Sequence, residues 1–112
     1  MPEWTPDAGD LVWLTFDPQA GREQAGRRPA LVLSPAAYNR RSGLAIMCPI
    51  TSHIKGYPFE VVLPRGLQVS GAVLADHVKS LDWHVRRAEL AGKVPASLLR
   101  EVQARLAPLL GL

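Results

Sequence analysis

Two polar segments of the sequence gather residue types that can bind a phosphodiester. The first lies before Pro29 and contributes three guanidinium groups, on Arg22, Arg27 and Arg28. The second contributes hydroxyls, an imidazole and an ammonium group, on Thr51, Ser52, His53 and Lys55. Guanidinium groups bind phosphate through paired hydrogen bonds, and hydroxyls can donate to the same oxyanion. If the fold brings the two segments together, they indicate a phosphodiester site.

Cleavage of RNA without a metal makes definite demands on such a site. The 2′-hydroxyl must lose a proton, the pentacoordinate phosphorane must be stabilised, and the 5′-oxygen must be protonated. Arg28 is the best candidate for stabilising the phosphorane, because its guanidinium group is permanently charged. The alternative is a solvated loop arginine. Arg27 points the other way in an extended chain, and we expect it to be a surface charge that helps to steer substrate.

The residues of the second segment and the loop glutamate each allow more than one interpretation. Thr51 stands where an apolar run becomes polar, so its hydroxyl either donates to a phosphate oxygen or satisfies a turn backbone, and Ser52 has the same ambiguity. His53 either transfers a proton near neutral pH or is an exposed loop histidine. Glu23 either holds an arginine in place, accepts a hydrogen bond from a base, or forms a structural salt bridge.

Metal and thiol chemistry find little support in the sequence. Cys48 and the histidines, His53, His77 and His84, have no recognised ligand spacing, so we expect no metal and no cofactor. Cys48 lies in an apolar run and is predicted to be a buried small hydrophobe. His77 and His84 are predicted to be structural. The tryptophans are predicted to pack in the core, with stacking of one or two of them on bases as the alternative.

Composition bounds the class of protein. The chain has 112 residues, of which 47% are apolar and 21% charged, and a formal net charge of +3. These values predict one folded domain over residues 1–112. The chain has no apolar stretch near the roughly 20 residues that span a bilayer, and Met1–Trp4 lacks the features of a secretory signal, so we expect a cytoplasmic protein. The positive charge favours an anionic partner, either nucleic acid or an acidic protein tail.

The elements around the polar segments are predicted to be short strands. Strand-favouring runs occupy residues 11–16, 30–33, 44–50, 59–63 and 71–81, the last as one bent strand or two short ones. Residues 17–28 and 51–58 are predicted to be exposed loops between strands. Residues 82–89 give no clear prediction. Several short strands joined by turns indicate a small β-barrel.

Two helices are predicted beside these strands. Ser34 and Pro35 predict a helix start with Ser34 as the N-cap, and this helix ends before Gly43. Apolar residues at helical spacing over 98–109 predict an amphipathic helix that packs on the barrel. Pro108 removes a backbone donor, so that helix is expected to kink or end there.

The polar segments and the strands around them resemble a known family. The string GDLVWLTFDPQAGREQAGRRPALVLSP resembles the first strand, first loop and second strand of the MazF/PemK family of bacterial ribonuclease toxins. The strings CPITSHIKGYPFEVVL and VLADHVKSLDW resemble its middle strands and dimer-forming region. The likeness covers nearly the whole chain, and the two loop motifs are specific in combination.

The resemblance implies a fold, an activity and partners. The fold is an SH3-like small β-barrel, of the kind shared by MazF and CcdB, in a homodimer. The activity is that of a toxin–antitoxin endoribonuclease that cleaves single-stranded mRNA by attack of the 2′-hydroxyl, without a metal, and so arrests translation and growth. The partner is a MazE-like antitoxin whose acidic disordered tail covers the basic loops.

The resemblance also assigns residues. The family's catalytic arginine and threonine fall on Arg28 and Thr51, and a loop glutamate implicated in activity falls on Glu23. We expect substrate contacts from Glu23, Arg27, Ser52, His53 and Lys55. His53 stands where the family pattern has glutamine, and Arg27 is more basic than its family counterpart, so the RNA sequence that is cut cannot be carried over. A CcdB-like gyrase poison and an RNA-binding barrel that does not cleave are the alternative functions.

Overall fold

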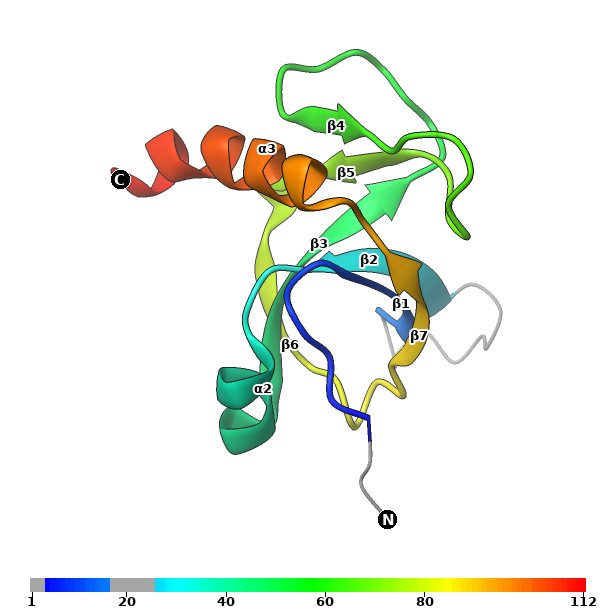
Figure 1. The fold of residues 1–112 in the computed structure, drawn as a ribbon, viewed down its shortest axis with the longest axis vertical. Helices are drawn as coiled ribbons and strands as arrows, with labels where there is room; N and C mark the ends of the chain where they lie inside the picture. The colour runs from blue at the N-terminus through cyan, green and yellow to red at the C-terminus, as the bar shows by residue number, and fades with distance from the viewer. Residues whose placement is uncertain (1–3, 17–25) are drawn as a thin grey trace.

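The computed structural model describes residues 4–16 and 26–112 of the chain (Figure 1). Its strands are β1 (Asp10–Thr15), β2 (Arg27–Val32), β3 (Leu44–Thr51), β4 (Glu60–Val62), β5 (Ala72–Leu74), β6 (Lys79–Asp82) and β7 (Glu89–Lys93). Its helices are α2 (Ala36–Ser42) and α3 (Ala96–Leu106), with 3₁₀ turns η2 (Ala75–His77) and η3 (Ala107–Leu110). The architecture is mainly β with a C-terminal helix, which confirms the predicted fold class.

The central strand of the sheet is β3. The described strands are ordered β4-β5-β3-β2-β1-β7, and β6 also pairs with β3. One edge of β3 pairs with β2, whereas the other edge pairs first with β6, over Leu44–Met47, and then with β5, at Ile50 and Thr51. The end of β3 therefore lies between the start of β2 and the β5–η2–β6 segment. Closure of this sheet into an SH3-like barrel stays a prediction.

Hydrophobic residues are buried on both faces of the sheet, which explains why the strand runs are almost continuously apolar. Leu11 and Leu31 belong to a cluster that includes Leu98 and Val102 of α3. The second cluster holds Val12, Leu14, Val32, Met47 and Leu81. Successive side chains of a strand point to opposite faces, so β1, β2 and β3 each contribute to both clusters. Figure 1 shows α3 beside β4 and β5, on the side of the first cluster.

The first helix begins differently from the prediction. Pro35 is the N-cap of α2, with no side-chain capping hydrogen bond. The hydroxyl of Ser34 instead donates to Oδ1 of Asn39, at 2.6 Å, and accepts a hydrogen bond from the amide of Ile46, at 2.8 Å. Asn39 is fully buried, so this hydroxyl satisfies a core amide and a strand amide and is not available to the helix. The predicted end of the helix before Gly43 is confirmed.

The remaining elements agree with the prediction, except that the structure adds one strand, β7. Residues 71–81 contain two short strands separated by η2, which is one of the two predicted forms. The segment that gave no prediction is a turn that leads into β7. The C-terminal α-helix gives way to η3 at Ala107, next to Pro108, as expected from the missing proline donor. Among the described residues, none of the helices has the length and apolar character that a membrane span requires.

Candidate active site

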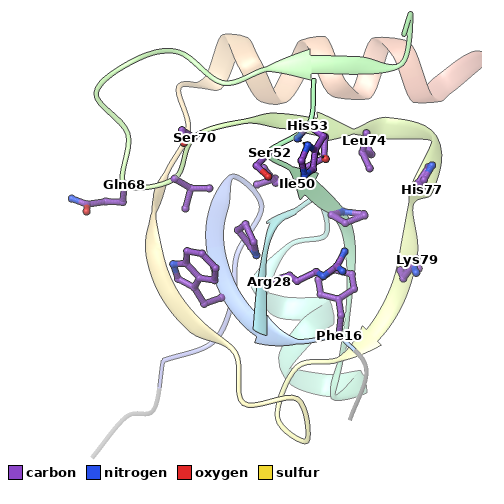
Figure 2. Close-up of a pocket in the computed structure, with 15 residues that line it drawn as sticks. Phe16, Arg28, Ile50, Ser52, His53, Gln68, Ser70, Leu74, His77 and Lys79 are labelled. Atoms are coloured by element: carbon purple, nitrogen blue, oxygen red, sulfur yellow. Dashed lines mark hydrogen bonds between the residues drawn. The ribbon is translucent and has the colours of Figure 1, made fainter. Parts of the chain in front are cut away.

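A pocket of about 720 Å³ lies where the start of β2 meets the end of β3 (Figure 2). Its lining comes from five separate stretches of the chain and consists of Trp13, Phe16, Arg28, Pro29, Pro49, Ile50, Thr51, Ser52, His53, Gln68, Val69, Ser70, Leu74, His77 and Lys79. Figure 2 shows Ser52 and His53 at one end, Phe16 at the other, and His77 and Lys79 along one side. The two polar segments that the sequence singles out therefore contribute to one pocket.

The register of β2 and β3 explains how Arg28 and Thr51 come together. Ala30 pairs with Pro49 and Leu31 with Cys48. The same antiparallel register, continued two residues toward the start of β2, sets Arg28 across from Thr51. Residues opposite each other in an antiparallel pair project to the same face of the sheet. The exposed guanidinium of Arg28 and the Thr51 hydroxyl accordingly share one wall of the pocket.

The structure shows one of the two interpretations of the Thr51 hydroxyl, the contact with a turn backbone, and its contact with phosphate stays a prediction. Its oxygen accepts a hydrogen bond from the backbone amide of His53, at 3.0 Å, which satisfies the turn. A hydroxyl that accepts one hydrogen bond can still donate its own proton. The turn therefore fixes the oxygen and leaves the proton free for an acceptor in the pocket.

The second loop is held by a carboxylate from β4, the strand that follows it. Glu60 is buried, and its side chain accepts hydrogen bonds from the backbone amides of Lys55, at 3.0 Å, and Gly56, at 2.8 Å. The Lys55 ammonium lies 5.8 Å from the centre of the Tyr57 ring, within the range of a cation–π interaction. Ser52 and His53 line the pocket, but Lys55 lies beyond its lining residues.

Arg27 is placed outside the pocket, on the other side of β2 from Arg28. One guanidinium nitrogen donates to the carbonyl oxygens of Arg86 and Arg87, at 3.2 and 2.9 Å, and the other lies 2.5 Å from a carboxylate oxygen of Glu89. These contacts tie β2 to β7 and the turn before it. Arg27 thus points away from Arg28, as expected from the alternation of side chains along a strand, and its role in steering substrate stays a prediction. Glu23 lies outside the residues that the structure describes.

Comparison with known proteins identifies the family. A profile described as PemK-like, MazF-like toxin of type II toxin-antitoxin system matches residues 7–110. The chain belongs to this toxin family. It is 48% identical to the endoribonuclease toxin MazF of Escherichia coli (strain K12) over 108 residues, which cover 96% of each chain. It is 33% identical to the endoribonuclease PemK of Escherichia coli, over 93% of this chain and 81% of PemK.

Solved MazF structures share the fold. A crystal structure of MazF (Form-I) from Deinococcus radiodurans is 64% identical and superposes with a TM-score of 0.90, covering 98% of this chain and 100% of the other. A MazE-MazF (Form-II) structure from the same organism is 58% identical, with a TM-score of 0.88 over 98% and 99% of the two chains. The family resemblance inferred from the two loop motifs is therefore confirmed.

Several residues of this toxin's pocket were not predicted as functional. His77 was expected to be structural and Trp13 to pack in the core, yet both line the pocket, as does Lys79. Residues i and i+2 of an extended segment project to the same side, so the polar pair around half-buried Val78 is a signal that could have indicated a functional wall. His84 lies in the turn before β7, away from the pocket, as predicted.

The cysteine of this toxin is not placed for catalysis. Cys48 is fully buried in the cluster beneath α3. Burial, with a further contribution from the charge of Asp76, raises the pKa of its thiol to about 12. A thiol of that pKa stays protonated at neutral pH, which confirms the prediction of a buried small hydrophobe. Across residues 4–16 and 26–112, His, Cys, Asp and Glu side chains do not gather in threes as metal ligands.

Proposed function

We propose that this chain is the toxin of a type II toxin–antitoxin module and cleaves single-stranded mRNA as an endoribonuclease. Its family membership supports the general activity. The observation that carries the site is the shared pocket of Arg28 and Thr51. The residues that line the pocket also suit a phosphodiester, because they include the cations Arg28 and Lys79 and neither aspartate nor glutamate.

The reaction that suits this pocket uses a nucleophile from the substrate. The 2′-oxygen forms a bond to phosphorus as its proton leaves, and the bond from phosphorus to the 5′-oxygen breaks as that oxygen gains a proton. Arg28 stabilises the negative charge of the phosphorane, and the Thr51 hydroxyl donates to a non-bridging oxygen. Because the substrate supplies the nucleophile, we propose that the reaction needs no metal.

His53 is our candidate for proton transfer. Its imidazole lines the pocket two residues after Thr51, and imidazole is the side-chain group best suited to proton transfer near neutral pH. Ser52 is positioned to contact the same RNA segment. We retain Glu23 and Lys55 as proposed substrate contacts, because the first loop and the second loop flank the pocket in sequence.

The decisive experiment compares two pocket variants with a matched control. Arg28→Ala and Thr51→Val each remove one donor, and we expect each to stay folded and to lose about 10²–10³ in kcat. Arg100→Ala removes an exposed arginine from α3, away from the pocket, and is expected to cleave at the parent rate. A folded Arg28→Ala protein with full activity would remove Arg28 from the site.

The same assay separates the alternative functions. Purified protein is incubated with mixed-sequence RNA in the presence of EDTA. Cleavage supports the endoribonuclease, and binding without cleavage supports an RNA-binding module. If the protein neither cleaves nor binds RNA, a CcdB-like gyrase poison becomes the favoured alternative. Sequencing the cut ends gives the recognition sequence.

We further propose a homodimer that is inhibited by a MazE-like antitoxin in the cytoplasm. A second groove, of about 420 Å³, has an almost wholly apolar lining that includes Ile46, Val78 and Leu110. An exposed apolar surface of this kind is suited to a second copy of the chain. The disordered acidic tail of an antitoxin would cover the basic loops. Sedimentation of the free protein, and titration with a synthetic acidic peptide from the neighbouring antitoxin gene, test the two parts separately.

A further inference from the structure

The pocket extends well beyond Arg28 and Thr51, along a second wall made by η2 and β6. His77 and Lys79 supply this wall, and Phe16 closes it at the end of β1 (Figure 2). Both polar side chains are exposed. None of these residues takes part in the chemistry derived above, so the wall needs an explanation of its own.

The position of this wall along β3 separates it from the reacting phosphate. Lys79 pairs with Met47, whereas Arg28 lies across from Thr51 at the far end of β3. Four residues of strand separate Met47 from Thr51, which is roughly 13 Å. The Lys79 ammonium also lies over the ring of Phe16, at the end of the pocket opposite Ser52 and His53. We infer that a phosphate bound by Lys79 is a neighbour of the phosphate held by Thr51.

The chemistry of the wall fits the RNA backbone better than a base. A lysine ammonium is a compact point charge that binds phosphate without reading base edges. The Lys79 ammonium lies 5.7 Å from the centre of the Phe16 ring, and such a cation–π contact favours a defined position for the charge. The His77 imidazole adds a further donor, although Asp76 lies 3.8 Å from it and competes for that donor. Grooves for single-stranded nucleic acid combine cationic and aromatic side chains in this way.

We propose that His77 and Lys79 form a second phosphate subsite, which binds a phosphodiester of the RNA that neighbours the scissile one. The inference rests on the proposed endoribonuclease function and assigns Lys79 to substrate binding, not to catalysis. An interaction that is equal in the ground state and the transition state changes KM and leaves kcat unaltered. The subsite therefore has a kinetic signature that differs from that of Arg28.

The test uses steady-state cleavage of a single-stranded RNA oligonucleotide that contains the mapped cut sequence. We expect Lys79→Gln to raise KM about tenfold, with kcat within about twofold of the parent value. The slope of log(kcat/KM) against log salt concentration should fall in magnitude by about 0.7, the value for one lost phosphate contact on a single strand. Lys79→Arg keeps the charge and should retain both values. Arg100→Gln also removes one positive charge, but from α3, and should leave the slope unchanged.

A modified substrate keeps the test decisive if Lys79→Gln folds poorly. Each phosphate of the oligonucleotide is replaced in turn by a neutral methylphosphonate. With the parent protein, we expect one position other than the scissile one to raise KM, and with Lys79→Arg the same position to respond. With a folded Lys79→Gln protein that position should have no further effect, as in a double-mutant cycle.

The outcomes distinguish the two proposals. A parent protein that does not cleave the RNA overturns the proposed function. A parent protein that cleaves, together with a Lys79→Gln variant whose KM and salt slope match the parent, overturns the subsite alone. The subsite is also overturned if no methylphosphonate outside the scissile position affects the parent enzyme.

Discussion

Gly71 links the stability of the sheet to the position of the Thr51 backbone. Its φ is +125°, and a Cβ added to it would lie 2.2 Å from the carbonyl oxygen of Thr51 and 3.1 Å from the carbonyl carbon. Contacts shorter than 3.0 Å are essentially never seen for real Cβ atoms, so residue 71 and Thr51 must move apart by about 0.8 Å. The contact is with backbone and cannot be relieved by a change of rotamer. A substitution here must therefore displace the backbone of residue 71, the end of β3, or both, and we expect the end of β3 to take part of the shift.

The expected cost of Gly71→Ala has two parts. A non-glycine residue in this backbone conformation costs about 1–3 kcal/mol of folding free energy. Moving Thr51 by nearly 1 Å takes its hydroxyl out of position for the phosphorane, and a misplacement of about that size can reduce a rate by about 10²-fold. We therefore expect Gly71→Ala to be destabilised by more than the backbone cost alone and to cleave RNA about 10²-fold more slowly.

Gly66→Ala is the matched control. Gly66 also has a positive φ, of +92°, but a Cβ added there would meet no heavy atom within 4 Å. This variant should lose only the folding free energy that the backbone conformation costs, about 1–3 kcal/mol, and keep kcat close to the parent value. Urea denaturation gives the stabilities, and RNA cleavage is measured at a temperature where both variants are folded. A folded Gly71→Ala protein that cleaves at the parent rate would refute the coupling between this turn and the site.

Three further predictions concern titratable groups. If His53 transfers a proton, His53→Gln should flatten the pH–rate profile between about pH 5 and 8, and an unchanged profile would exclude that role. The hydrogen bond from Lys93 to buried Asp10, followed by the charge of that carboxylate, raises the pKa of Lys93 above its ordinary 10.5. The folded-state pKa is the higher one, so this stabilisation is complete below about pH 10.5 and is lost above it; melting temperatures of the parent and Lys93→Met should converge as the pH rises through that range, and a constant gap would contradict the assignment. Because Cys48 is buried and its thiol has a pKa of about 12, a disulfide reagent such as DTNB should react at pH 8 only as the protein unfolds, and immediate reaction of the folded protein would contradict this.

The sequence predicts the strands well because both faces of the sheet are buried. The residues from Leu44 to Ile50 are all apolar, which predicts a strand buried on both faces. They form β3 together with one further residue, Thr51. The start of β2 was placed three residues too late, because Arg27 and Arg28 are polar residues at the end of a strand. These residues pair with β1, where Arg28 lies opposite Leu14. Such a long-range pairing cannot be predicted from the local composition of the sequence.

The site was predicted in part, for a similar reason. Arg28 and Thr51 stand at clear boundaries between polar and apolar sequence, so their functional interpretation was accessible. The contribution of Lys79 depends on its pairing with Met47, more than thirty residues earlier in the chain. The structural contacts of Arg27 depend on Glu89 and the turn before it, in a segment for which the sequence gave no clear element. Long-range pairing decides both cases.

The hydrogen bonds from the second loop to Glu60 of β4 have a consequence for how such enzymes diversify. Glu60 fixes the loop through backbone amides at its far end, so the anchoring does not depend on which side chains occupy the exposed positions 52–54. If Ser52 and His53 contact RNA as proposed, substitutions there change the groups that face RNA and leave the Glu60 contact in place. We therefore expect that exchanging residues 52–54 between relatives alters the RNA sequence that is cut and leaves the fold of the loop intact.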